Sequence, residues 1–408
     1  MNNSKIILSH SGKQHSYHVA KAMQDLGILD GFYTSSYVKQ KWIQELLTRS
    51  GNKFFTRRFR EGLSGEIVHP HWRFELKEIL YARIYGNVPK TQHAVYDRDA
   101  KFDQYMAQKL PHLSGDIFWG FQGSCLHSLR SALQAGKKAV VELATAHVTA
   151  AKIILGEEQK LHPEWADSFD NLEFPAPYEK RLREEPHQAD VVIAASKFTR
   201  QTLLDDGVGE GKIKYLPLGF EIDYIPYHKK EFKSRKRPLR LLYVGRITQR
   251  KGIKYLLEAM KGFDKSEVEL HIIGFVHGNG DALKEYAGLF TLHPPLQQYE
   301  LFKKYAEYDA LVLPSVFEGF GLVILEAMAA GLPVITTPNT MGPELIVNDE
   351  NGYIVPIRDI DSIKVAIQNL LNKNEEERMV MADGAHNAAL QYSWDAYAAN
   401  LAVLLNEF

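Results

Sequence analysis

The chain has 408 residues, more than one ordinary hydrophobic core accommodates, so its length predicts two domains. Hydrophobic content of 45%, charged content of 24% and a formal net charge of -1 are typical of a soluble globular protein and exclude a nucleic-acid binder that relies on bulk charge. The single cysteine, Cys125, excludes an internal disulfide and a multi-cysteine zinc site. No apolar run approaches about 18 residues, so we predict no signal peptide, no membrane span and a cytoplasmic location.

Short β-rich segments alternate with helical segments along the chain, a pattern typical of parallel sheets built from βαβ units. The first unit combines a strand and a glycine turn over 6–12 with a helix that carries apolar residues at helical spacing. Further strands are predicted at DIFWGF, AVVELAT and ADVVIAAS, and a helix at KFTRQTLLDDG follows. These elements predict a Rossmann-like domain over residues 1–220.

Residues 217–238 are polar and basic and contain three prolines, as expected of a linker. Beyond them LRLLYVGR restarts the pattern of strand, glycine turn and helix, and VELHIIG, DALVLPS and LPVITTP continue as strands. We therefore predict a second Rossmann-like domain over 221–392. Ser393 is placed to cap a last helix over 393–408 that has an apolar stripe.

The segment EGFGLVILE, residues 318–326, places two carboxylates eight residues apart around a Gly-x-Gly turn. It follows a strand that ends near Leu313, so the amides of 319–322 lie at a predicted helix N-terminus, which attracts phosphates and polar oxygens. Open parallel sheets bind ligands at this edge. We expect Glu318 and Glu326 to address one ligand. The alternative is that Glu318 caps the helix and Glu326 pairs with a neighbour.

A second signal is VGRITQRKG, residues 244–252, again just past a predicted strand. Gly245 permits a close backbone approach, while Arg246 and Lys251 are two positive charges that can hold a diphosphate. The alternative is a solvated surface loop. Its position at the same sheet edge as Glu318 favours an anion site.

These two segments together resemble the retaining nucleotide-sugar glycosyltransferases of family 4, in which the acids of EGFGLVILE match an E-x7-E motif. The resemblance extends from Ala189 to Leu405 and includes ASKFTRQTLL, PLGFEID and SWDAYAANL, the last similar to that family's helix that returns to the first domain. It implies an α/β structure of the GT-B fold, with two Rossmann-like domains facing a central cleft.

The resemblance also implies roles for individual residues. Glu318 would address the donor sugar, Glu326 the ribose, and Arg246 and Lys251 the pyrophosphate. Gly12, in SGKQHSYHVAKAMQDLG, occupies the place of the family's N-terminal glycine loop. The expected catalytic residues are Glu318, Arg246, Lys251 and His147, and the expected donor-binding residues are Gly12, Gly245, Arg246, Lys251, Gly319, Phe320, Gly321, Leu322 and Glu326.

His147, in VELATAH, follows a predicted strand where the resemblance implies a histidine near the sugar and the acceptor. The alternative is a loop histidine whose hydrogen bonds are satisfied within the fold. Asp97 and Asp99 mimic a D-x-D metal site, but they stand before a predicted helix, and we interpret them as a helix cap and surface charge.

The reaction implied by the resemblance is transfer of a hexose-type sugar from a nucleoside diphosphate to a hydroxyl of a glycan or lipid-linked acceptor, with retained anomeric configuration. Uridine is the favoured base and guanosine the next. The resemblance implies neither a metal nor a cofactor. The alternatives are an epimerase or inverting transferase of the same fold, and a non-catalytic nucleotide-sugar sensor.

Residues 37–61 carry seven cations against two acids, so seven minus two gives +5, and aromatic residues are interleaved with them. The cations are Lys39, Lys41, Lys53, Arg49, Arg57, Arg58 and Arg60; the acids are Glu45 and Glu61; the aromatics after Tyr37 are Trp42, Phe54, Phe55 and Phe59. This mixture suits adsorption to an anionic bilayer, which would make the protein peripheral to the inner face of the cell membrane. A solvated insertion is the alternative.

Overall fold

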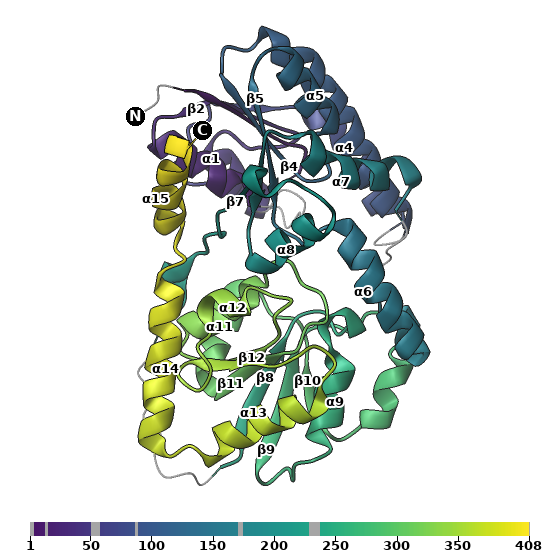
Figure 1. Ribbon diagram of the computed structural model, residues 1–408, viewed down its shortest axis with the longest axis vertical. Coiled ribbons are helices and arrows are strands. Elements are labelled where there is room, and N and C mark those ends of the chain that lie inside the picture. The colour runs from purple at the N-terminus through teal and green to yellow at the C-terminus, as the bar shows by residue number, and fades with distance from the viewer. Residues whose placement is uncertain are drawn as a thin grey trace.

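The computed structural model describes residues 4–12, 15–49, 58–85, 89–169, 174–227 and 237–407. The chain forms two α/β units, each built on a parallel sheet, which are stacked along the long axis of the molecule (Figure 1). The first sheet has the strand order β3-β2-β1-β4-β5-β6-β7 and the second β10-β9-β8-β11-β12-β13. In both, the chain starts near the centre and extends first to one edge and then to the other, as in doubly wound folds.

The strands of the first sheet are β1 (Ile6–His10), β2 (Leu29–Thr34), β3 (Val68–Pro70), β4 (Ile117–Phe121), β5 (Lys138–Leu143), β6 (Val191–Ala194) and β7 (Ile213–Tyr215). Those of the second are β8 (Leu239–Val244), β9 (Val268–Ile273), β10 (Phe290–His293), β11 (Ala310–Leu313), β12 (Val334–Thr336) and β13 (Gly352–Ile354).

The α-helices up to residue 220 are α1 (Ser16–Asp25), α2 (Lys41–Arg49), α3 (Leu76–Tyr85), α4 (Pro89–Lys109), α5 (Leu126–Gln134), α6 (Val148–Leu161), α7 (Ala176–Gln188) and α8 (Lys197–Asp205). Those beyond it are α9 (Ile253–Met260), α10 (Gln298–Lys304), α11 (Leu322–Ala329), α12 (Gly342–Leu345), α13 (Ile360–Asn372), α14 (Glu375–Leu390) and α15 (Trp394–Leu404).

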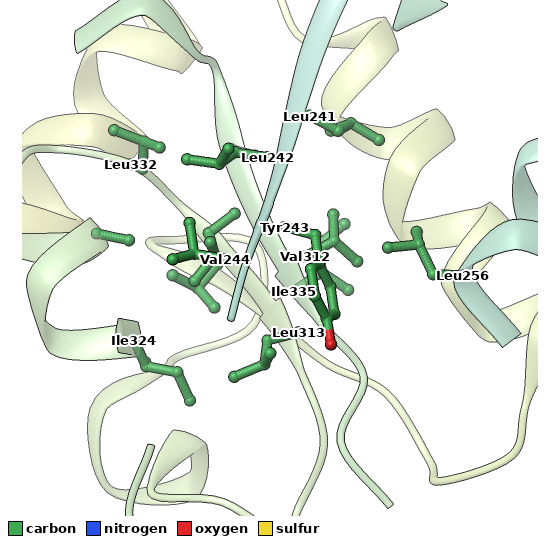
Figure 2. Close-up of a cluster of buried hydrophobic side chains, with 14 of the residues drawn as sticks. Leu241, Leu242, Tyr243, Val244, Leu256, Val312, Leu313, Ile324, Leu332 and Ile335 are labelled. Atoms are coloured by element: carbon green, nitrogen blue, oxygen red, sulfur yellow. The ribbon is translucent and has the colours of Figure 1, made fainter. Parts of the chain in front are cut away.

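The central strand of the second sheet, β8, is buried on both faces, as parallel strands covered by helices must be. Figure 2 shows Leu241 and Tyr243 on the side of Leu256 from α9, and Leu242 on the side of Leu332. The apolar run that predicted this strand therefore supplies core to both layers and fixes where the strand ends, at the loop that begins with Gly245.

The last helix returns to the first unit, as the resemblance implied. Ser393 caps α15 by accepting a hydrogen bond from the Ala396 amide at 3.1 Å. Tyr397, Leu401 and Leu404 are buried in the core of the first unit. Figure 1 shows α14 and α15 running up one side of the molecule from the second unit to the first.

Two chain crossings lie side by side where the units meet. Phe220 pairs with Ser393 in a parallel bridge. Gly219 packs so tightly on Trp394 that a Cβ there would lie 2.7 Å from the indole ring. Because the first sheet ends at Tyr215 and the second begins at Leu239, we propose the domain boundary near residue 220.

Candidate active site

A cleft of about 920 Å³ lies between the two units, at the carboxyl ends of β5, β8 and β11. From the first unit and the crossings it is lined by His15, Tyr17, His18, Phe59, Arg60, Ala144, Thr145, Leu218, Gly219, Phe220, Glu221, Tyr224 and Trp394. From the second unit it is lined by Val244, Gly245, Lys251, Gln298, Tyr299, Phe302, Glu318, Phe320, Gly321, Leu322, Val323 and Glu326. Ligands of open α/β sheets bind at this edge.

The centre of the second-unit wall is an ion pair between the two predicted segments. Lys251 Nζ lies 2.9 Å from Glu318 Oε2, and Arg250 approaches the other oxygen at 3.5 Å. Burial alone would raise the pKa of Glu318, but the charges of Lys251 and Arg250 outweigh it and hold that pKa below its ordinary value. Glu318 is therefore an anion held between two cations at the cleft.

The start of α11 forms the floor beside this ion pair. Gly321 precedes the helix with φ +84°, a conformation that favours glycine, and no side chain caps the first turn. Glu318 therefore does not cap the helix, so this half of the alternative is wrong; the other half, that Glu326 pairs with neighbours, holds. Leu322 is 43% exposed at the first helical position, so the amides of this turn can reach a ligand in the cleft.

Glu326 lies one turn into α11 and also lines the cleft. Its oxygens accept hydrogen bonds from the Tyr305 hydroxyl at 3.1 Å and from Gln298 at 3.4 Å. Burial raises the pKa of Glu326, because these hydrogen bonds offset the loss of solvation only in part. The two acids of the motif are thus brought to one cavity with opposite pKa shifts.

Two positions of the second unit beside the cleft require glycine, each for a different structural reason. Gly245 lines the cleft with φ +132°, which an L side chain rarely adopts. Gly319 is one place where the two units touch, since a Cβ there would lie 2.3 Å from Thr145 Cα. Its carbonyl also accepts a hydrogen bond from Ser196 at 2.7 Å. Gly319 therefore sets how closely the walls approach.

The first-unit wall presents two histidines. His15 Nε2 lies 2.8 Å from Glu142 Oε1, and Glu142, whose side chain is fully buried, also accepts a hydrogen bond from the Trp119 indole at 2.8 Å. His18 stacks on Trp394 with ring centroids 4.5 Å apart. These contacts fix the orientation of both imidazoles beside the cleft.

Arg60 lies on the same wall and pairs with Glu221 of the crossing. Glu221 also lies 3.2 Å from His18 Nδ1. The first-unit wall is therefore polar but largely paired within itself, and it can offer several donors and acceptors to sugar hydroxyls.

Four predicted residues do not line the cleft: Gly319, described above, and Arg246, Gly12 and His147. Arg246 is exposed just past β8, next to the lining residue Gly245. Gly12 is buried, and its amide donates to His10 Nδ1 at 2.9 Å. His147 is fully buried, with Nδ1 3.4 Å from Asp206.

His147 is turned away because it begins α6, and its amide donates to the Thr202 hydroxyl of α8 at 3.0 Å. Burial, only partly offset by Asp206, lowers the pKa of His147 and keeps the imidazole neutral. His147 is thus held within the fold, but among the described residues neither ring nitrogen makes a hydrogen bond, so the alternative of a satisfied histidine holds only in part. Ala144 and Thr145, earlier in this loop, line the cleft.

Arg250 is a contact of Glu318 that the sequence did not single out. Besides approaching the carboxylate, it donates to the Phe317 carbonyl at 3.3 Å, and its own carbonyl accepts from the Val316 amide at 3.0 Å. Its place one residue before Lys251 in a segment with three cations was the available signal.

The interpretation of Asp97 and Asp99 is wrong in part. Both lie inside α4 instead of capping it. Asp97 is a surface residue that pairs with Lys101 at 3.1 Å. Asp99 is buried and accepts a hydrogen bond from Ser11 at 2.6 Å. In the part of the chain that the structure describes, no group of three His, Cys, Asp or Glu side chains is arranged to hold a metal ion.

Comparison with known proteins identifies the fold that contains this cleft. The solved structure of Anabaena HepE in complex with UDP and glucose is 14% identical, superposes with a TM-score of 0.64, and covers 99% of this chain and 100% of that one. At that identity the likeness shows the fold alone. The two facing parallel sheets with a returning helix are the GT-B fold.

A family match covers the second unit. Residues 225–387 match the family described as Glycosyl transferases group 1. It is 26% identical over 248 residues to the D-inositol 3-phosphate glycosyltransferase of Xylanimonas cellulosilytica, covering 55% of this chain and 59% of that protein.

It is also 27% identical over 247 residues to the GDP-mannose-dependent alpha-(1-6)-phosphatidylinositol monomannoside mannosyltransferase of Mycobacterium tuberculosis, covering 55% and 63%. The matched region spans about a third to two thirds of the length of the curated relatives, from 32% to 63%.

Proposed function

We propose that this protein is a retaining glycosyltransferase that moves a hexose-type sugar from a nucleoside diphosphate, UDP before GDP, to a hydroxyl of a glycan or lipid-linked acceptor. The observation that carries the proposal is the ion pair of Glu318 with Lys251 beside the free first turn of α11, on the wall of an interdomain cleft. This wall lies within the segment that matches the family.

The donor would lie along the second-unit wall. Lys251 lines the cleft and supplies positive charge for the diphosphate, while Arg250, which pairs with Glu318 and does not line the cleft, adds to the positive potential; the amides of Phe320, Gly321 and Leu322 supply hydrogen-bond donors. Arg246 is proposed to reach the diphosphate from the rim of the cleft. Glu326 is proposed to accept from the ribose hydroxyls, since its oxygens already accept from hydroxyl and amide groups.

The acceptor would then bind on the first-unit wall. His15, His18 and Arg60 lie there with fixed orientations, and Thr145 adds a hydroxyl close to Gly319. Two other predicted donor contacts, Gly12 and Gly319, stay predictions; Gly319 packs against Thr145, and Gly12 is buried with its amide donating to His10.

In the proposed reaction the bond between the sugar anomeric carbon and the β-phosphate oxygen breaks, and negative charge develops on that oxygen. Lys251, Arg250 and the helix N-terminus stabilise this charge more than they stabilise the intact donor. The acceptor hydroxyl attacks from the same face and passes its proton to the departing phosphate oxygen. Glu318 balances the positive charge that develops on the ring.

The direct test incubates the protein with UDP-glucose, UDP-galactose and GDP-mannose in EDTA, with and without a panel of glycan and glycolipid acceptors. We expect slow release of one nucleoside diphosphate without acceptor and a product with the donor's anomeric configuration. Inverted product would refute retention. Tight binding with no release under any condition would favour the sensor.

We further propose that α2 adsorbs to an anionic bilayer. Of its region, residues 50–57 lie outside the described residues, Arg58 is buried against Glu75, and Arg60 belongs to the cleft. Among the described side chains of α2, the exposed apolar residues are Trp42 and Leu46, which lie one helical turn apart and are 64% and 63% exposed. Apolar anchors beside Lys39 and Lys41 suit a membrane surface.

In the described residues no helix combines the length and the apolar character needed to cross a membrane. Co-sedimentation with liposomes of phosphatidylglycerol at low salt tests the adsorption. Trp42→Glu should abolish it, whereas Val380→Glu, at an equally exposed apolar residue of α14, should leave it intact. If the wild-type protein stays in the supernatant, the adsorption proposal is lost.

A further inference from the structure

A segment of the first unit packs into the second. Residues 148–168, which we call the strap, comprise α6 and the 3-10 helix Pro163–Ser168, and they lie in sequence between β5 and α7. Figure 1 shows α6 extending from the first unit alongside the second, on the side opposite α14. Leu155 and Trp165 of the strap are buried in the hydrophobic core of the second unit. The strap therefore joins the two units away from the crossings.

The strap buries one carboxylate, Glu158, against the second unit. Its Oε1 accepts from Gln249 Nε2 and from the Tyr255 hydroxyl, each at 2.7 Å. Its Oε2 accepts from Arg358 Nε at 2.6 Å. Glu158 has no exposed surface, so a buried charge is satisfied here by three groups of the other unit.

Gln249, the first of these partners, is itself fully buried and held from three directions. Its backbone amide donates to the Ser168 hydroxyl of the strap at 3.0 Å. Its Oε1 accepts from the Lys254 amide at 3.0 Å, at the start of α9. The strap thus fixes both the backbone and the side chain of Gln249.

Gln249 begins the 3-10 helix Gln249–Lys251, which ends at the lysine of the donor wall. The Arg250 carbonyl in its middle accepts from the amides of Val316 and Phe317, at 3.0 and 3.2 Å. These amides directly precede Glu318. Fixing Gln249 therefore fixes the position of Lys251 and the loop that carries Glu318.

We propose that Glu158 is a positioning residue for the donor diphosphate, which it reaches only through Gln249 and the helix Gln249–Lys251. This inference rests on the proposed function, because it takes Lys251 as a ligand of the diphosphate. It makes the donor wall a product of both units, since one of its supports comes from a segment that precedes the family match by more than fifty residues.

The test compares Glu158→Gln with two matched variants. Glu157→Gln removes the neighbouring carboxylate, which pairs with Arg358 at 2.8 Å but is not bonded to Gln249. Asp167→Asn weakens another contact of the strap, with the Asn279 amide at 2.6 Å. Calorimetry on the full chain measures the dissociation constants of UDP, GDP and ADP and of the matching nucleosides.

We expect Glu158→Gln to raise the dissociation constant of the nucleoside diphosphate that the wild type binds by about tenfold. The dissociation constant of the matching nucleoside should change less than about threefold, because only the cations are displaced. Both control variants should bind both ligands as the wild type does. A general loss of structure would weaken nucleoside and diphosphate alike, so the ratio of the two constants isolates positioning.

An unchanged ratio in Glu158→Gln, with normal binding by the wild type, would overturn the positioning role and leave the proposed function intact. If the wild type bound none of the three diphosphates, the proposed function would fail and the inference with it. Should Glu158→Gln not fold, Gln249→Ala removes the other end of the same hydrogen bond, and the same tenfold change in ratio is required of it.

Discussion

The two walls of the cleft are built in different ways. On the second-unit wall the main groups come from two short segments, 244–252 and 314–326, each of which follows one strand of one sheet. The first-unit wall gathers His15, Arg60 and Thr145 from three distant parts of the chain, and the crossing adds Glu221. A wall made of contiguous segments suits a part of the ligand that stays the same, such as the donor nucleotide. A wall assembled from distant segments can change with the acceptor.

The largest expected effect is on the second-unit wall. Lys251→Ala removes the cation closest to Glu318 and should lower kcat/KM by about a hundredfold, or about 2.7 kcal/mol of transition-state stabilisation. Steady-state kinetics with the active donor measure it. Lys261→Ala, an exposed lysine of the same unit, is the matched control. Equal kinetics for the two variants would remove Lys251 from the mechanism.

The next effect should come from the contact between the walls. In Gly319→Ala the new methyl group would meet Thr145 Cα at 2.3 Å, so the units must move apart. Turnover should fall about tenfold, since a small misplacement of the reacting groups is costly, while the dissociation constant of the nucleoside diphosphate stays within about threefold. A loss of nucleotide affinity equal to the loss of turnover would show that Gly319 acts within the donor wall.

A smaller effect is expected on the first-unit wall. His15→Gln breaks the hydrogen bond with Glu142 and should lower transfer to acceptor about fivefold, on the scale of one hydrogen bond, without weakening nucleotide binding. His112→Gln, at an exposed histidine, should change neither. Weaker nucleotide binding in His15→Gln alone would mean that the donor extends onto this wall.

The smallest effect concerns pH and the junction of the units. Burial raises the pKa of Glu344 to about 7, although the Lys197 amide of the first unit donates to its carboxylate. The folded protein thus holds a proton that the unfolded chain releases near its ordinary pKa of about 4.5. The contribution of protonated Glu344 to the free energy of unfolding is fully present below about pH 4.5 and is lost as pH rises through about 7.

Thermal unfolding from pH 5 to pH 8 checks this. The melting temperature of the wild type should fall by a few degrees more than that of Glu344→Gln, in which no proton is lost. Parallel curves for the two proteins would show that Glu344 titrates normally.

The comparison of the walls also explains what the sequence could predict. Glu318, Glu326 and Lys251 were predictable because each stands at a fixed distance from a strand end or helix start, and local pattern sets that distance. His15, Arg60 and Glu221 were not, because only the packing of distant segments brings them together. Local pattern predicted β1, β4, β5 and β6 of the first sheet and β8, β9, β11 and β12 of the second for the same reason, whereas β2, β3, β7, β10 and β13 were not predicted.

His147 shows the limit of local reasoning. The strand before it was predicted where β5 lies, but the helix that starts at Val148 turns the ring toward Asp206 instead of the cleft. The strap was missed in a similar way, because an apolar pattern indicates that a helix is buried and does not say in which core. The role of Glu158 became visible only with the contacts across the units.

The most direct test of the central claim is a thermal-shift panel of UDP, GDP, ADP and CMP with excess EDTA. A ligand at about 100 times its dissociation constant adds about 2.7 kcal/mol to the free energy of unfolding if it binds only the folded state. We predict that one nucleoside diphosphate, UDP first, raises the melting temperature of the wild type and not that of Lys251→Ala. No shift with any nucleotide, or an equal shift in Lys251→Ala, would contradict the donor site described here.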